Sequence, residues 1–452
     1  MMHKSVFPSA PSIDGRQRKL IVGIIMTALG MVAIVIAALA TGGHPDPPAL
    51  RGAATLLDGN WHFRTGDDPR WSAPATDVAA WQTIDMSALP GSHDGDVGLP
   101  DYVPGWAAQG HRGYHGYAWY RRAVTVPAGH EPWVILGPTL VEDGYELYWN
   151  GQRLGGPGRL GPDPRLVGTR PLLFALPADA AATRGVLAIR TYMLPRAQYD
   201  AAGGGMHSPP ILAPQSTGAA LHRVQWERTI AGYLVDAVEP VAMLALVALA
   251  LVYWRRSSHK GFLVFACIAL VLTAERRLNN ALVSWTDLQS LGTYSWLVTV
   301  MWVPMMAAWV LAWNRWCPRP WRSIDALAVA LAVVGLIGAL TPWPSMVGVC
   351  WLGSLALFVV IAARMVRNGP MRTLALLTLA AIIAEQFGSE LLDPISVPGI
   401  WFPFGIGVSR TQYIYAIAIP LLAILVVRTL TFKEHATTSD VETLRQLGEA
   451  KR

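Results

Sequence analysis

The order of apolar and polar segments divides the chain into a membrane part and a globular part. Seven apolar runs follow one another between Gly232 and Leu430, and one more, Leu20–Ala40, precedes residues 41–230 of ordinary mixed sequence. A helix needs about 20 mostly apolar residues to cross a bilayer, and each run comes close to that length. The predicted spans are 20–40, 232–254, 261–282, 293–313, 323–341, 345–363, 372–392 and 411–430.

Composition supports this division. The chain has 452 residues, of which 52% are hydrophobic and 15% charged, a balance typical of a membrane protein with one sizeable soluble part. All three cysteines, Cys267, Cys317 and Cys350, lie in or beside predicted spans. The globular region therefore folds without disulfides, although we expect it on the oxidising side of the membrane.

Lysine and arginine in the short loops predict the orientation, because positive loops stay in the cytoplasm. The loops at 283–292, 341–345 and 393–408 contain neither residue, and the intervening loops contain all of these: Arg255, Arg256, Lys260, Arg315, Arg319, Arg322, Arg364, Arg367 and Arg372. The pattern predicts a membrane protein with both termini in the cytoplasm and residues 41–230 on the opposite side of the membrane. The net charge of +6 follows mostly from this bias and gives no reason to expect nucleic-acid binding.

The first apolar run has two interpretations. Ala38-Leu39-Ala40 resembles a signal-peptidase site, but the run is longer than the usual apolar core of roughly 7–15 residues in a signal peptide. An uncleaved signal anchor is favoured, and both interpretations leave residues 41–230 outside the cytoplasm.

The globular region has the pattern of an all-β domain. Two short runs flank Asn150-Gly151, the strongest short hairpin signal, because a type I′ turn needs positive φ at both central residues. Other predicted strands are Trp61–Arg64, Tyr117–Val126, Trp133–Leu136, Arg170–Ala175 and Val186–Tyr192. Strands at this density predict a sandwich or a jelly roll.

Several of these motifs resemble the sugar-binding jelly roll of family-two glycoside hydrolases. They are LDGNWHFR at 57–64, WQ at 81–82, GYAWYRR at 116–122, VEDGYELYWNG at 141–151 and GVLAIR at 185–190. A jelly roll followed by seven spans resembles the bacterial seven-transmembrane receptors with diverse intracellular signalling modules. That resemblance covers residues 50–430, and in the seven-span part it rests on layout alone. It implies a bacterial inner-membrane protein whose periplasmic domain senses a ligand, often carbohydrate. It also implies a bundle that passes the signal to a kinase, cyclase or phosphatase module.

The predicted organisation has four parts. They are a cytoplasmic N-terminus and signal anchor (1–44), an extracytoplasmic jelly-roll sensor domain (45–228), a seven-transmembrane-helix domain (229–430) and a cytoplasmic helical tail or linker (431–452).

An aromatic, glycine-rich segment at 101–116 is the predicted ligand-binding loop. Sugars stack on aromatic rings while polar groups bind their hydroxyls, and the residues here that suit this chemistry are Tyr102, Trp106, Arg112 and Tyr114. The alternative is that aromatic residues of the following strand, such as Trp119 and Tyr120, only pack a core.

No metal, cofactor or catalytic group is predicted. His111 and His115 have a spacing that suits a metal only on a helix, which Gly113 opposes, and the aspartates at 94, 96 and 101 fit a solvated turn better than a calcium loop. The sequence contains no GxSxG, HExxH or P-loop motif, so we do not expect an enzyme in these residues.

Charged residues inside the predicted spans are the sharpest functional signal, because such residues are rare and usually functional. The predicted intramembrane polar cluster consists of Asp236, Glu239, Glu275, Arg276, Arg277, Glu385 and Glu390. We predict that Arg276 or Arg277 pairs with Glu385 or Glu390. The alternative is that both arginines end a short span and reach to the membrane surface.

The sequence therefore predicts a signal-transducing receptor, with a transporter or a glycan-handling membrane enzyme as the alternative and a structural protein not excluded. Its expected partners are a small-molecule or carbohydrate ligand, the lipid bilayer and a cytoplasmic signalling module. A short amphipathic helix that begins at Ser439 resembles the linker of a dimeric output module, so a homodimer is expected.

Overall fold

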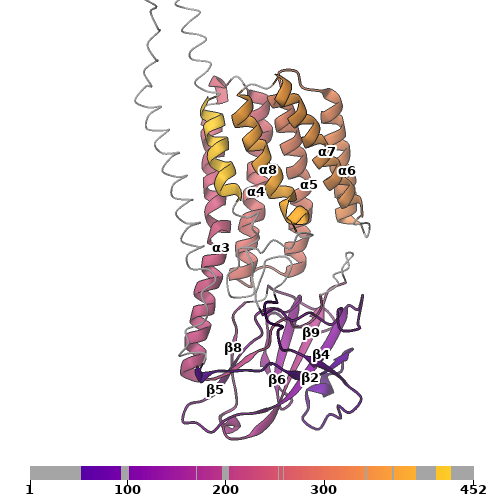
Figure 1. Cartoon of the computed structure of the whole chain (residues 1–452), viewed down its shortest axis with the longest axis vertical. Coiled ribbons are helices and arrows are strands. Elements are labelled where there is room, and N and C mark those ends of the chain that lie inside the picture. The colour runs from indigo at the N-terminus through magenta and orange to yellow at the C-terminus, as the bar shows by residue number, and fades with distance from the viewer. Residues whose placement is uncertain are drawn as a thin grey trace, which may run out of the picture.

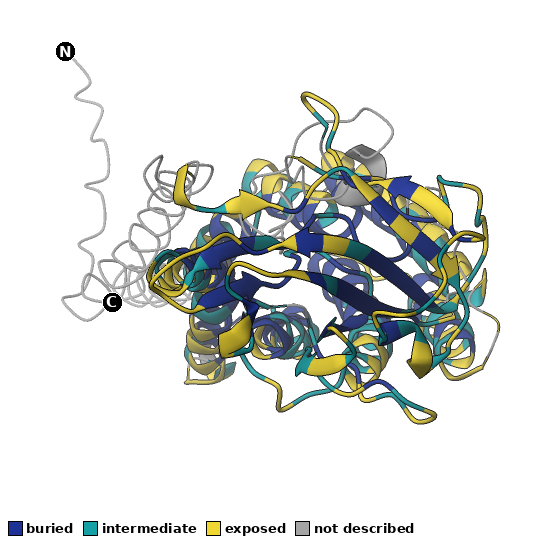
Figure 2. Cartoon of the chain, turned by 90° about the horizontal axis from the view of Figure 1, so that it is seen from below, coloured by how far each residue is buried: buried dark blue, intermediate teal, exposed yellow. Residues whose placement is uncertain are grey.

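The chain forms an all-β domain joined to a helical bundle (Figure 1). The structure is a computed structural model that describes residues 52–92, 101–168, 170–195, 203–252, 254–257, 259–341, 343, 345–368, 371–392 and 414–428. The predicted span 20–40 and the tail 431–452 lie outside these residues. Figure 2 views the chain from the β-domain side, where buried strands run through the middle and exposed loops surround them.

Two antiparallel sheets build the β domain. One has the strand order β1-β10-β5-β8 and the other β3-β2-β4-β9-β6-β7. The strands of the first sheet are β1 (Thr55–Leu56), β10 (Ile211–Pro214), β5 (Trp133–Leu136) and β8 (Leu173–Ala175). Those of the second are β3 (Gln82–Asp85), β2 (Asn60–Thr65), β4 (Gly116–Thr125), β9 (Arg184–Met193), β6 (Gly144–Trp149) and β7 (Gln152–Gly155).

Alternation along the strands makes this pair of sheets a sandwich. Phe63 on β2, Tyr120 on β4 and Ile189 on β9 share one buried core with Ile135 and Leu212 of the other sheet. The intervening residues, such as Trp119 and Ala188, point to the opposite face and form a smaller apolar cluster there. A period of two residues per strand produces this division.

The strand predictions are confirmed, with shifts of one to three residues at most ends. The predicted hairpin is present between β6 and β7, and its central residues Asn150 and Gly151 have φ of 48° and 86°. These positive angles are what a type I′ turn requires. The strand Trp133–Leu136 has the predicted bounds.

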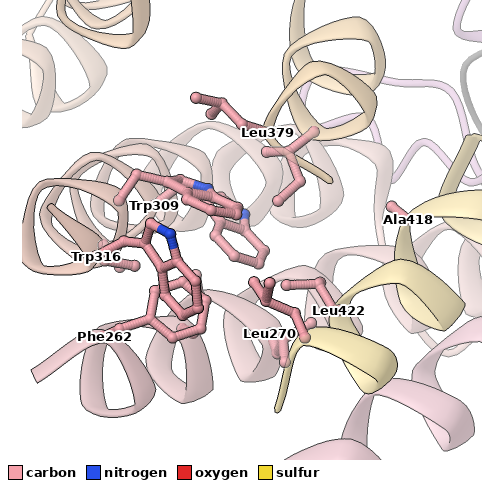
Figure 3. Close-up of a cluster of buried hydrophobic side chains, with 14 of the residues drawn as sticks. Phe262, Leu270, Trp309, Trp316, Leu379, Ala418 and Leu422 are labelled. Carbon is pink, nitrogen blue, oxygen red and sulfur yellow. The ribbon is translucent and has the colours of Figure 1, made fainter. Parts of the chain in front are cut away.

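Seven helices follow among the described residues. They are α3 (Gln215–Val252), α4 (Lys260–Trp285), α5 (Leu291–Trp316), α6 (Arg322–Leu340), α7 (Ser345–Asn368), α8 (Arg372–Leu392) and a helix at Tyr415–Arg428. Four of them, α3, α5, α6 and α7, are long and apolar enough to cross a membrane. Helices α4 and α8 are not in that set, but both contribute to the common apolar core, as Figure 3 shows for Phe262 and Leu379.

Helix α3 differs most from the prediction. The sequence indicates a globular domain that extends to residue 228, whereas the helix begins at Gln215, directly after the last strand, and continues for 38 residues. Its first turns pack on the four-stranded sheet, where Leu221 shares a buried cluster with Leu136 and Ala213. These turns contain many polar residues, because only part of the helix surface faces the sheet and the rest is exposed. They therefore lack the long apolar run from which the other helices were predicted.

The sandwich and the bundle meet at a second place, the segment 165–170, of which residue 169 lies outside the described residues. Leu291 N, at the start of α5, donates a 2.9 Å hydrogen bond to Leu166 O, and Arg170 Nη2 lies 3.3 Å from Asp287 Oδ2. The backbone at Gly168 lies against the carbonyl oxygen of Val283, so closely that a Cβ there would come within 2.6 Å of it. In the described part of the chain, the sandwich is thus attached to the bundle at two separate points, this segment and α3.

Candidate functional sites

A buried ionic cluster lies in the interior of the bundle and centres on Arg277 of α4. Its guanidinium donates from Nη1 to Asp236 Oδ1 of α3 at 3.2 Å and from Nη2 to Glu385 Oε1 of α8 at 2.9 Å. Arg277 Nε lies 3.7 Å from Glu239 Oε2, and the guanidinium carbon lies 5.1 Å from the centre of the Tyr415 ring. The relative exposures of these side chains range from 0% to 6% for the four charged groups, so all of them are buried.

The cluster joins four segments that are far apart in sequence. Asp236 and Glu239 lie one turn apart on the same face of α3, since residues three apart are neighbours on a helix. Gln386 on α8 donates its amide hydrogens to Glu385 and to Tyr415 Oη, the latter at 3.0 Å. One guanidinium with five donors in a planar fork suits this role, because it can reach several carboxylates at once.

The structure brings together four of the seven residues of the predicted intramembrane polar cluster: Asp236, Glu239, Arg277 and Glu385. The pairing of Arg277 with Glu385 is one of the four that the sequence suggests. Glu275 and Arg276 precede Arg277 on α4 and are half-buried. Asp236 accepts a hydrogen bond from Arg277, and Glu385 accepts one from Arg277 and one from Gln386. Glu390 lies in α8, and its side chain is outside the described residues.

The position of Arg277 does not fit the alternative of an arginine that reaches to the membrane surface. Its residue exposure is 5%, and it is paired on both sides. Removal of one partner from a buried pair leaves an uncompensated charge, which costs roughly 3–5 kcal/mol. The cluster therefore holds α3, α4 and α8 in one arrangement.

The predicted ligand-binding loop has mostly structural contacts. Trp106 has 0% exposure, packs beside Phe63 and donates from its indole nitrogen to Tyr114 O at 3.3 Å, so its ring has no free face for a sugar. The hydroxyl of Tyr114 donates to Tyr117 O at 2.6 Å and accepts from Gly66 N at 3.0 Å, which holds two turns together. Burial raises the pKa of Tyr114.

Tyr102 and Arg112 are the accessible members of that loop. Tyr102 is half-buried and stacks on the ring of His207 at 4.7 Å, and Arg112 is exposed. Of the four predicted residues, Trp106 is buried in the core, Tyr102 and Tyr114 are half-buried, and Arg112 is exposed. The sequence could not make this distinction, because glycine-rich segments have no periodicity from which burial can be read.

A second charged group lies on the outer face of the six-stranded sheet, and the sequence analysis missed it. Arg190 donates to Asp67 at 2.8 and 2.5 Å and to Glu146 Oε2 at 3.1 Å, and lies over the ring of Tyr117. Burial works to lower the pKa of Arg190, but the hydrogen bonds and charge of Asp67 and Glu146 raise it overall. Burial and the neighbouring Glu146 carboxylate raise the pKa of Tyr148 to about 12.

The alternation of Glu146, Tyr148 and Arg190 opposite the core-facing residues is the signal that could have revealed this group. Its charges satisfy one another, because Glu146 also accepts from Arg153 at 3.0 Å and from Tyr148 at 2.9 Å. We therefore assign it to the stability of the sheet.

Metal-binding residues are not gathered at any point of the described chain: no group of three or more His, Cys, Asp or Glu side chains there could hold a metal ion. His111 Nε2 lies 2.6 Å from Gln82 Oε1, and burial lowers the pKa of His111. His115 is exposed, and residues 94 and 96 of the predicted aspartate turn lie outside the described part.

Comparison with known proteins gives a weak structural similarity. No family model matches the chain, and no curated protein matches it. Among solved structures, a β-glucuronidase of Bacteroides uniformis has 22% identity and a TM-score of 0.25 over 36% of this chain and 18% of its own. A β-glucuronidase of Bifidobacterium dentium has 16% identity and a TM-score of 0.26 over 36% and 30%.

Another of these structures is described as a β-glucuronidase from glycoside hydrolase family 2, with 17% identity and a TM-score of 0.26 over 35% of this chain and 17% of its own. The chain spans less than a third of the length of these structures. This last neighbour carries the name of the family that the strand motifs resemble, but the similarity is weak and assigns neither a family nor an activity to this chain.

Proposed function

We propose that the chain is an inner-membrane signal-transducing receptor. In this proposal the sandwich is a jelly roll that senses an extracytoplasmic ligand, with carbohydrate as the expected class. All seven helices form the membrane domain and relay the signal to a cytoplasmic output module, in a homodimer. The observation that carries the proposal is the continuity of α3 from the sheet to the buried ionic cluster.

Helix α3 suits the transmission of a displacement. Its first turn is fixed to the sandwich, where Ser216 N donates a 2.9 Å hydrogen bond to Glu131 Oε2 and Gln215 N donates to Pro132 O. Asp236 follows Gln215 by 21 residues, which is about 32 Å of helix at 1.5 Å per residue. One rigid element thus joins the sheet to the carboxylates that hold Arg277.

The second attachment joins the sandwich to α4 and α5, so that α3 can move relative to these helices. Segment 165–170 contacts the outer ends of α4 and α5, so a ligand that reorients the sandwich would shift α3 relative to α4. The Asp236–Arg277 contact joins those two helices. A buried ion pair with two arrangements is a suitable two-state element, because such a contact either forms or breaks.

The test uses the full chain in lipid nanodiscs on a glycan array, followed by hydrogen exchange with any glycan that binds. A receptor should bind a glycan and change the exchange of amides in α4 and α8, far from the sandwich. A glycan that binds and changes exchange in the sandwich alone would contradict signal relay. Uptake of the bound compound into proteoliposomes would instead support a transporter, the alternative that the buried charges also suit.

A further inference from the structure

The buried ionic cluster contains more carboxyl groups than its guanidinium can neutralise. Asp236, Glu239 and Glu385 are three acids around one Arg277. Arg276 of α4 is half-buried and lies near enough to act on Asp236. Three ionised carboxylates around one guanidinium would repel one another, and a buried carboxylate that accepts no hydrogen bond is very costly.

Glu239 differs from the other two acids in its contacts. Asp236 and Glu385 each accept a hydrogen bond from Arg277, at 3.2 and 2.9 Å. Neither oxygen of Glu239 accepts one from any described residue, although the side chain is only 1% exposed. Arg277 Nε at 3.7 Å and the backbone amide of Ala416 face Glu239 without reaching hydrogen-bond geometry.

An independent observation comes from Gln386, which is not an acid. Its amide nitrogen donates to Glu385 and to Tyr415 Oη, but its Oε1 is buried and accepts no hydrogen bond from the described residues. The polar atoms of Glu239 and Gln386 that have no partner among the described residues are all acceptors, so these two side chains lack a hydrogen-bond donor. A protonated carboxyl supplies a donor and removes a charge at the same time.

We propose that Glu239 is a proton-binding site, and that the cluster holds a proton on this carboxyl at neutral pH. Asp236 and Glu385 remain ionised, because each accepts a hydrogen bond from Arg277. A proton needs only one oxygen, which agrees with the lack of any described group of acids that could hold a metal ion. Because α3 carries Glu239, a movement of this helix would change the site, and release of the proton would accompany the change.

Infrared spectroscopy of the full chain in nanodiscs tests this directly, since protonated and ionised carboxyl groups absorb at different frequencies. We expect a protonated-carboxyl band at pH 7 that disappears in Glu239→Gln and persists in Glu227→Gln, a matched change at an exposed acid of the same helix. A wild-type chain without that band at pH 7 would overturn the proposal, whether or not the variant folds.

Thermal melting supplies a second readout. Glutamine resembles a protonated glutamate, so Glu239→Gln should melt at the wild-type temperature, while Asp236→Asn and Glu385→Gln, which remove charges paired with Arg277, should melt lower. Equal losses in all three variants would refute the assignment to Glu239. A melting temperature that rises with NaCl but not with KCl at fixed pH would show a sodium site instead and would also refute it.

Discussion

Arg277 on α4 and Glu385 on α8 are 108 residues apart in sequence and form a 2.9 Å hydrogen-bonded ion pair in the interior of the bundle. Asp236 binds the other side of the same guanidinium, so one side chain connects α3, α4 and α8. Because α3 begins on the sandwich, a change in the position of the β domain would act on the packing of the bundle through this interaction.

Replacement of Arg277 should destabilise the chain strongly. Arg277→Met keeps much of the volume but leaves three buried acids without their partner, so we expect a loss of roughly 3–5 kcal/mol. The measurement is thermal or denaturant unfolding in detergent. Arg276→Met is the matched control and should cost well under that, because the side chain is half-buried. Equal losses in both variants would show that the cluster does not hold the helices together.

The contact between segment 165–170 and the bundle can be tested with a pair of glycines. Gly168→Ala places a methyl group within 2.6 Å of the Val283 carbonyl oxygen, so the segment must move away. We expect faster hydrogen exchange at the Leu291 amide, which donates to Leu166 O. Gly161→Ala is the control, because nothing lies within 4 Å of its Cβ. Unchanged exchange in Gly168→Ala would mean that this contact does not form in solution.

The start of α3 should loosen in acid. Hydrogen bonds from the side chain and backbone of Ser216 lower the pKa of Glu131 below its ordinary value of 4.5. A lowered pKa in the folded state contributes stability that is complete above the unfolded pKa and is lost as the pH falls through the folded one. Protection of the Ser216 amide should therefore decrease below about pH 4.5. Glu131→Gln should show no such pH dependence, and a dependence that persists there would assign it to another group.

Substitutions in the predicted ligand-binding loop should affect folding at one residue and ligand binding at another. Trp106→Ala empties a buried site and should cost about 3–5 kcal/mol, which unfolds or weakens the sandwich regardless of ligand. Arg112→Ala changes an exposed side chain, so stability should shift by no more than about 0.5 kcal/mol. If a glycan binds this loop, Arg112→Ala should weaken binding with an unchanged melting temperature. Wild-type affinity in Arg112→Ala would place the ligand elsewhere on the sandwich.

Local sequence patterns explain which features of the structure could be predicted from the sequence. The hairpin at Asn150-Gly151 and the strand Trp133–Leu136 depend on local turn chemistry and short apolar runs, and both are present. Apart from the start of α3, the long apolar runs predicted the ends of the described bundle helices to within about five residues. Residues Arg277 and Glu385 were identifiable because charges stand out in such runs.

Features that depend on tertiary contacts were not predictable. Residues 215–231 have no long apolar run, since that part of α3 packs on a sheet with only part of its surface. Burial of Trp106 depends on the glycine-rich backbone at 203–205, where Gly204 and Gly205 lie so close to the indole that neither could carry a Cβ without a clash. The choice of Arg277 over Arg276 depends on which side of α4 faces α3 and α8.

Coupling through α3 is the central claim, and hydrogen exchange in the full chain measures it most directly. Leu221→Ala loosens α3 from the sheet at a residue with 2% exposure, about 22 Å of helix from Asp236. The account predicts faster exchange of amides around Arg277 and Glu385 in this variant. It also predicts that adding Glu227→Pro, which breaks the helix between the two places, removes that distant effect, while Glu227→Ala preserves it. Faster exchange confined to the sheet and the first turns of α3 in Leu221→Ala would contradict the account.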